Sequence, residues 1–249
     1  YKILMIGYQA QVLPAMFAAI TLCYVEKFFN KRTPEVLKLV WVPFITLVVT
    51  GFLTILFIGP FARTLGELLT GFFGFLFKTP GLKYLGALLF GSLYAPLVIT
   101  GLHHTFIAVD LQLAASTGGT FIWPMIAISN IAQAGAVFAT YFLYKSDKKQ
   151  ESVSMSGFVS AAFGITEPAM FGANMKFMYP FYAALIGSAV GALICTHFTV
   201  LANGIGVGGV ALAWLSIKAS SMGIFMLATV IAFGLAFGLT FVFNKTKLN

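Results

Sequence analysis

Apolar runs of about 20 residues follow one another along almost the whole chain. A run of that length, folded as an α-helix, crosses the ~30 Å hydrocarbon core of a lipid bilayer. Hydrophobic residues make up 59% of the 249 residues and charged residues only 9%. The strands of a membrane barrel would alternate apolar and polar residues, and these runs do not alternate. We therefore expect an all-α polytopic membrane protein.

Basic residues between the apolar runs predict how the chain is threaded, because short basic loops stay on the cytoplasmic side. They form three clusters: Lys27, Lys31, Arg32 and Lys38; Lys145, Lys148 and Lys149; Lys245 and Lys247. Placing all three clusters inside gives about seven spans and a cytoplasmic C-terminus. The predicted spans are residues 3–24, 40–58, 59–77, 84–100, 121–144, 177–201 and 223–243.

The net charge of +8 is explained by these loops. It comes without a basic stripe that has interleaved aromatic residues, so no nucleic-acid partner is expected. Cys23 and Cys195 lie far apart in apolar segments, which indicates buried free thiols rather than a disulfide or a metal pair. Neither a metal nor a cofactor is expected. Arg63 and Glu67 are four residues apart and predict an ion pair within one helix.

The chain starts at Tyr1, without an initiator methionine, and runs directly into an apolar segment. We expect that a further N-terminal portion precedes it.

Two stretches are too polar or too interrupted for an ordinary span, yet too apolar for an exposed loop. We predict that both are re-entrant hairpins, at residues 102–120 from outside and 157–176 from inside. Interrupted backbone at membrane depth is tolerated where it lines a cavity, and paired interruptions point to a transporter's binding site. The first stretch contains His103, His104, Asp110, Gln112, Gly118 and Gly119, and the second contains Glu167, Pro168, Gly172 and Asn174.

Glu167 is the strongest candidate for a functional residue. An ionisable residue at membrane depth is costly and marks a substrate path or a reacting group. The nearest basic residue along the chain is Lys176, so the partner of Glu167 must come from elsewhere or be a ligand. Pro168 biases Glu167 away from helical geometry, which predicts a helix break. A carboxylate there can accept hydrogen bonds from sugar hydroxyls and can act as a general base.

His103 and His104 are adjacent, and adjacent helical residues point about 100° apart, so at most one is expected to face a ligand. Packing in an apolar wall is the alternative for each. Asp110 lies within two turns of them. It either takes part in the site directly or is a structural partner of a histidine or a backbone amide.

The chain resembles the membrane-embedded C component of enzyme II of the bacterial sugar phosphotransferase system, glucose superfamily. The resemblance covers essentially the whole chain. It depends on four motifs: Gly101-Leu102-His103-His104; Thr117-Gly118-Gly119-Thr120 with Trp123-Pro124; Ser129-Asn130-Ile131-Ala132-Gln133; and Gly164-Ile165-Thr166-Glu167-Pro168-Ala169-Met170-Phe171-Gly172. It implies a homodimeric ten-helix transporter, of which this chain holds the last seven helices. Residues 1–58 would end a scaffold domain and residues 59–249 would form the transport domain.

The family performs group translocation: a sugar enters from outside and is phosphorylated by a phosphocysteine on a cytoplasmic B domain. The resemblance implies that Glu167 and one of the two histidines act in sugar binding and phosphorylation. Thr166, Asp110 and Asn203 are further substrate-binding candidates. The B domain's Cys-x-Thr-Arg-Leu-Arg type motif is absent around Cys23 and Cys195, so a B domain fused upstream or separate is the expected partner.

The segments 202–209 and 167–172 look most like the trehalose-specific branch, with sucrose, β-glucosides and maltose as alternatives. The glycine-rich segment 202–209 can also be read as a flexible periplasmic loop. Two other classes of function remain open: a proton-coupled secondary transporter that releases unmodified sugar, and a purely structural membrane subunit.

Overall fold

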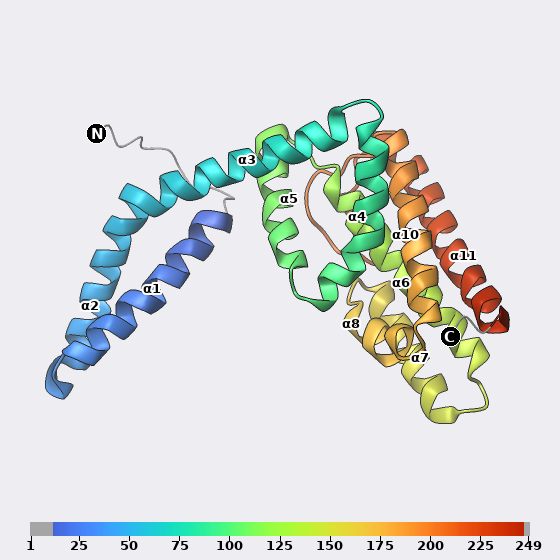
Figure 1. The fold of residues 1–249 in the computed structure, drawn as a ribbon, viewed down its shortest axis with the longest axis horizontal. Coiled ribbons are helices and arrows are strands. Elements are labelled where there is room, and N and C mark those ends of the chain that lie inside the picture. The colour runs from blue at the N-terminus through green and yellow to red at the C-terminus, as the bar shows by residue number, and fades with distance from the viewer. Residues whose placement is uncertain (1–11, 247–249) are drawn as a thin grey trace. The chain divides into compact units, whose positions relative to one another are not determined.

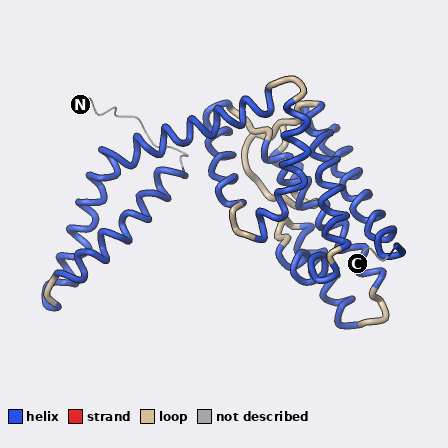
Figure 2. The backbone as a smooth tube through the Cα atoms, in the orientation of Figure 1, coloured by secondary structure: helices blue, strands red, loops and turns tan. Residues whose placement is uncertain are grey.

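The computed structural model describes residues 12–246, and every regular element among them is helical (Figures 1 and 2). Contacts divide the chain into two compact units, Tyr1–Phe73 and Gly74–Asn249. This division falls inside helix α3 (Gly59–Lys78). The boundary predicted between the scaffold and transport domains, after residue 58, lies at the beginning of the same helix.

The first unit contains a helical hairpin of α1 (Val12–Arg32) and α2 (Glu35–Leu53). The two helices are joined at Pro34, whose extended ψ of 147° ends helical geometry. Large apolar side chains cover their outer surface, and Val36 is 91% exposed. Such a surface is unfavourable in water and is satisfied by lipid. Part of the predicted span 3–24 lies outside the described residues.

The helix does not reverse after α2 as the predicted spans require. It continues through a π-helical turn (η1, Thr54–Ile58) directly into α3, and Figure 1 shows the axis bending there. Pro60, which has no backbone N–H, stands just after this turn, and prolines and π-turns are the usual causes of a kink. The reversal predicted at residues 58–59 is therefore wrong. The predicted Arg63 and Glu67 pair involves side chains outside the described part of the structure.

Four helices of the second unit pack side by side: α4 (Leu82–Ile99), α6 (Ile122–Leu143), α10 (Tyr179–His197) and α11 (Met222–Thr246) (Figure 1). Helix α6 is central, and nearly all of its side chains are buried. Close approach depends on small residues: a Cβ on Gly187 of α10 would lie 2.6 Å from the Ala232 carbonyl of α11. Ser188 also donates a buried hydrogen bond of 2.6 Å to the Gly91 carbonyl of α4.

Five helical runs among the described residues are long and apolar enough to cross a membrane. They are Glu35–Ala62, Leu82–Ile99, Ile122–Leu143, Tyr179–His197 and Ala219–Thr246. These runs correspond to the predicted spans 40–58, 84–100, 121–144, 177–201 and 223–243. The predicted span 59–77 is the continuation of α2 rather than a separate apolar helix.

The two stretches expected to be hairpins fold differently from each other. Residues 102–120 form one helix, α5 (His103–Thr117), followed by a left-handed turn at Gly118. In the second stretch the chain reverses between α7 (Lys148–Ala162) and α8 (Glu167–Ala169). After this reversal, α8 continues into a π-helical turn (η2, Met170–Asn174) and then into α9 (Met175–Phe177).

The long connection from α10 to α11, drawn mainly in tan in Figure 2, contains two short helices, η3 (Ala213–Ser216) and η4 (Ala219–Ser221). It is tied to the bundle, since Ala202 pairs with Thr120 and with Ile217 in isolated bridges. Both cysteines are free thiols. Cys195 is buried as predicted, whereas Cys23 is exposed on α1, so its predicted burial is wrong.

Candidate functional site

The reversal that precedes Glu167 has a fixed geometry. Gly164 adopts φ +94°, a left-handed conformation that glycine enters without steric cost. The Ser160 hydroxyl donates to the Ile165 carbonyl at 2.9 Å and closes the turn. Glu167 is then the first residue of α8, and Pro168 lies in the first helical turn, where its missing N–H is not needed. The predicted break therefore precedes Glu167, which is itself helical.

Side chains from neighbouring helices hold the segment that follows Glu167. Asn174 donates to the Gln133 side chain at 2.7 Å and to its carbonyl at 3.1 Å. Gln150 donates to the Gly172 carbonyl at 3.2 Å and accepts from Lys176 at 2.6 Å. Buried polar groups with these partners fix one arrangement of the backbone. The π-helical turn η2 is thus attached to both α6 and α7.

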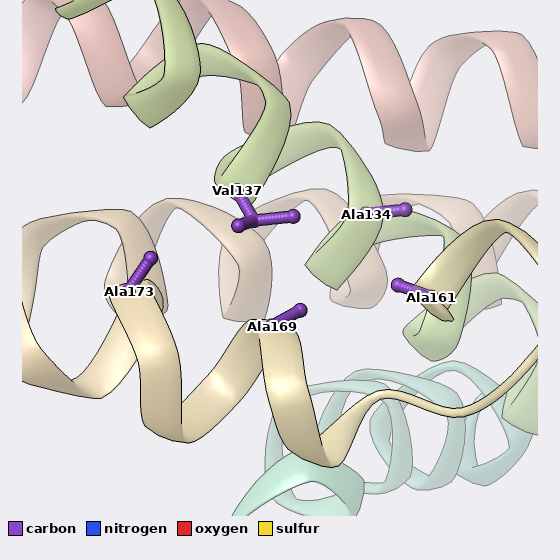
Figure 3. Close-up of a cluster of buried hydrophobic side chains, with 5 residues drawn as sticks. All are labelled: Ala134, Val137, Ala161, Ala169 and Ala173. Atoms are coloured by element: carbon purple, nitrogen blue, oxygen red, sulfur yellow. The ribbon is translucent and has the colours of Figure 1, made fainter. Parts of the chain in front are cut away.

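Small apolar side chains fill the interface between this segment and the bundle. Figure 3 shows the cluster, which comprises Ala134, Val137, Ala161, Ala169 and Ala173. All of them are fully buried. Alanines allow α6, α7 and the α8 segment to approach closely, so the reversal has little freedom to shift.

The polar residues of α5 point to three different environments. His103 is half-buried, and the ring of the exposed His104 lies 4.0 Å from it between centroids. Asp110 is 0% exposed and accepts a short hydrogen bond from the Thr120 hydroxyl. Thr120 in turn accepts from the Ile122 amide at 3.0 Å, at the beginning of α6. Asp110 therefore contacts Thr120 and not a histidine.

A cavity of about 290 Å³ lies at the reversal, within the second unit. Small-molecule sites have volumes of roughly 300–1,000 Å³, so the cavity is just below the lower limit of that range. Its walls come from α4, α5, α6, the reversal and the glycine-rich loop before η3. They comprise Tyr94, Val98, His103, Ile107, Trp123, Ile126, Asn130, Phe163, Gly164, Ile165, Thr166, Glu167, Gly206, Val207 and Gly208.

Three of the predicted site residues, His103, Thr166 and Glu167, line this cavity together. The other three do not. His104 is exposed and Asp110 is buried. Asn203 is an exposed residue at the beginning of the glycine-rich loop, and its backbone N–H donates to the Ser216 carbonyl at 2.8 Å.

Sequence reasoning missed Tyr94, Trp123 and Asn130 as lining residues. A signal for two of them was present. Trp123, Ile126 and Asn130 are spaced by three and four residues, which places them on one face of α6. This spacing, in a segment that also carries two of the family motifs, predicts that one face of the helix contacts a ligand.

A cavity that combines apolar walls with a few polar groups at interrupted backbone, inside an apolar helical bundle, is typical of membrane transport proteins. The model of the family Phosphotransferase system, EIIC matches residues 1–188. The chain belongs to this family and is a multi-pass membrane protein.

Curated relatives agree with this assignment. The chain is 42% identical over 243 residues to the trehalose-specific EIIBC component of Bacillus subtilis, covering 97% of this chain and 51% of that protein. It is 42% identical over 246 residues to the trehalose-specific EIIBC component of Escherichia coli, covering 98% of this chain and 51% of that protein. It is 44% identical over 208 residues to the sucrose-specific EIIBC component of Staphylococcus xylosus, covering 82% of this chain and 43% of that protein.

The chain thus spans about half the length of the curated relatives it matches. No solved structure matches it significantly.

Proposed function

We propose that the protein containing this chain carries a disaccharide across the bacterial cytoplasmic membrane and phosphorylates it at the 6-hydroxyl. The phosphoryl donor is a phosphocysteine on an EIIB domain, either fused upstream or separate. Membership of the EIIC family and the EIIBC composition of the relatives support this proposal. The complete protein would then be an enzyme, a sugar phosphotransferase.

The observation that carries the proposal is the convergence of Thr166, Glu167 and His103 on one cavity. A carboxylate accepts hydrogen bonds from sugar hydroxyls, and an imidazole can donate or accept one. In the transfer step, the oxygen of the sugar 6-hydroxyl attacks phosphorus while the Glu167 carboxylate takes the proton of that hydroxyl. The O–P bond forms, the S–P bond of the phosphocysteine breaks, and the cysteine leaves as a thiolate.

We assign the histidine role to His103, because it lines the cavity and His104 does not. His104 remains the alternative. Asp110 acts through Thr120 as a positioning residue of the α5–α6 junction. Asn203 would reach the sugar only from the edge of the glycine-rich loop.

Trehalose is the proposed sugar, and sucrose is the first alternative. The relatives named for the two sugars are 42% and 44% identical to this chain, so overall identity does not separate them.

We also propose that the protein is a homodimer with a cytoplasmic C-terminus. If so, Lys145, Lys148 and Lys149 should resist impermeant amine reagents in intact cells and react in inverted vesicles.

The test uses membrane vesicles containing the full-length protein and loaded with the phosphoryl donor proteins. Labelled trehalose and sucrose are supplied outside, and the internal label is separated into free and phosphorylated sugar. Accumulation of the 6-phosphate alone supports the proposal. Free internal sugar driven by a pH gradient would contradict it and favour a proton-coupled transporter. Unchanged uptake in Glu167→Gln would favour a structural subunit.

A further inference from the structure

The glycine-rich loop of residues 203–209 forms one wall of the cavity and is anchored at both ends. Before it, Ala202 and Thr120 exchange two backbone hydrogen bonds of 2.8 and 2.9 Å. After it, the Ala211 amide donates to the Ala162 carbonyl at 3.0 Å. The loop is therefore attached at one end beside α6 and at the other end beside the reversal.

The backbone of this wall has unused hydrogen-bonding capacity. Gly206, Val207 and Gly208 line the cavity. Within the described part of the chain, neither the N–H groups nor the carbonyls of residues 204–208 form a hydrogen bond. Gly206 and Val207 are exposed and Gly208 is buried, so the free backbone groups of this wall bond to water or to a ligand. The wall therefore offers donors and acceptors to whatever fills the cavity.

Asn130 extends this polar surface from α6. It is only 9% exposed, it lines the cavity, and its amide has no hydrogen-bond partner among the described residues. It also touches the wall, since a Cβ on Gly208 would lie 2.4 Å from Asn130 Nδ2. A side-chain amide and a peptide backbone both donate and accept, as a hydroxyl does. Together they form one continuous surface suited to hydroxyl groups.

The charged side chains of the lining indicate which chemical class of ligand the cavity can bind. Among the described residues that form the cavity there is no lysine or arginine. Arginine and lysine are the side chains that hold phosphate and carboxylate groups. The cavity is therefore suited to a neutral polyhydroxyl compound.

We propose that Asn130 and the backbone of residues 206–208 bind the hydroxyl groups of the sugar and determine which disaccharide is preferred. This inference rests on the proposed function and adds its specificity surface. A site that hydrogen-bonds particular hydroxyls discriminates strongly against a sugar that lacks them or presents them elsewhere. Glu167 and His103 serve the reacting hydroxyl, whereas this surface reads the remainder of the molecule.

The experiment measures dissociation constants of labelled trehalose, sucrose and maltose for purified full-length protein. Asn130→Ala removes the amide, and Gly208→Ala forces it aside. Gly204→Ala is the matched control, because a Cβ there meets nothing within 4 Å. We expect Asn130→Ala and Gly208→Ala to bind the preferred sugar about tenfold more weakly. We also expect unequal changes for the three sugars, and Gly204→Ala within about twofold of the parent.

Kinetics give an independent readout. Asn130→Ala should raise the KM for sugar while phosphorylation at saturating sugar stays near the parent rate, because the reacting groups are untouched. Removing an amide that has no protein partner leaves no other group unsatisfied, so the variant should fold. Asn130→Asp, of nearly the same shape, keeps an acceptor and loses the donors, and should show the same loss of affinity.

The outcomes separate the two proposals. If the parent protein binds none of the three sugars, the proposed function itself fails. If the parent binds and the Asn130 and Gly208 variants bind all three sugars unchanged, or with equal losses, the specificity surface is overturned. Loss of affinity in Gly204→Ala equal to that in Gly208→Ala would also overturn it.

Discussion

Residues 102–120 and 157–176 differ in sequence but share one pattern, since both are apolar stretches interrupted by polar residues and glycine. The first folds as one helix, α5, and gives a single polar side chain, His103, to the cavity. The second breaks between α7 and α8, and the consecutive residues 163–167 all line the cavity. A helix directs only one residue in three or four to a given side, whereas a break exposes neighbours together. The interruption of the backbone therefore concentrates the functional groups.

The largest effect should come from the broken segment. Glu167→Gln removes the proposed base with little change in shape, and general-base catalysis contributes about 10²–10⁴-fold. We expect phosphorylation to fall at least about 100-fold while the protein stays folded, as judged by yield and gel filtration. Glu151→Gln is the control, because Glu151 pairs with Lys148 on α7 at 2.7 Å and does not line the cavity that contains Glu167. A near-parental rate in Glu167→Gln would remove Glu167 from the mechanism.

The next effect compares the glycines that precede the functional residues in the two segments. Gly101 and Gly164 have φ of +76° and +94°. Alanine in this conformation costs about 1–2 kcal/mol at either site. Only at Gly164 would the added Cβ also approach backbone, 2.9 Å from the Gly208 amide. Gly164→Ala should therefore lower the thermal unfolding midpoint more than Gly101→Ala and should alone abolish sugar binding.

Equal destabilisation by the two alanines, with sugar binding retained in both, would show that the reversal is not a fixed part of the site. The comparison between the segments would then lose its basis.

Within α5, the two histidines should behave differently. His103→Ala removes a group that lines the cavity, and we expect sugar binding to weaken about tenfold. His104→Ala changes an exposed ring outside the cavity lining, and its affinity should stay within about twofold of the parent. Isothermal titration with the preferred sugar measures both. The reverse order of effects would reassign the histidine role to His104.

The smallest effect on transport should come from Asp110. Asp110→Ala leaves the buried Thr120 hydroxyl without its acceptor, which costs about 1–3 kcal/mol of stability. Asp110→Asn retains an acceptor oxygen and should recover most of that loss. Sugar affinity should remain within about twofold of the parent in both variants, because Asp110 does not line the cavity. A tenfold loss of affinity in Asp110→Asn would instead indicate direct sugar contact.

Much of the membrane architecture was predictable, since apolar length and composition alone specify helices of bilayer thickness. The prediction failed at residues 58–59, where threading the chain between the basic clusters required a reversal. The π-helical turn η1 instead joins α2 to α3 in one continuous helix. Such a choice depends on how hydrogen bonds are redistributed over a few residues, which residue types alone do not specify.

The site shows the same division. Glu167, Thr166 and His103 could be nominated from their chemistry, because polar groups are rare and costly in such a chain. Asp110 is chemically as unusual, yet it is directed into the protein against Thr120. Asn130 attracted no attention as a site residue, although its amide is free and faces the cavity. Burial and partners separate these two residues, and both are properties of packing.

By itself the sequence determined that the chain is a bundle of apolar helices with a carboxylate beside a glycine-bearing break. It did so because solvent preference and backbone freedom are properties of residues and their near neighbours. Only the tertiary structure decided that the loop of residues 203–209, the reversal at Gly164 and the α6 face bearing Asn130 enclose one cavity. These segments are distant along the chain, and they meet through glycine contacts and close-packed alanines that no local pattern encodes.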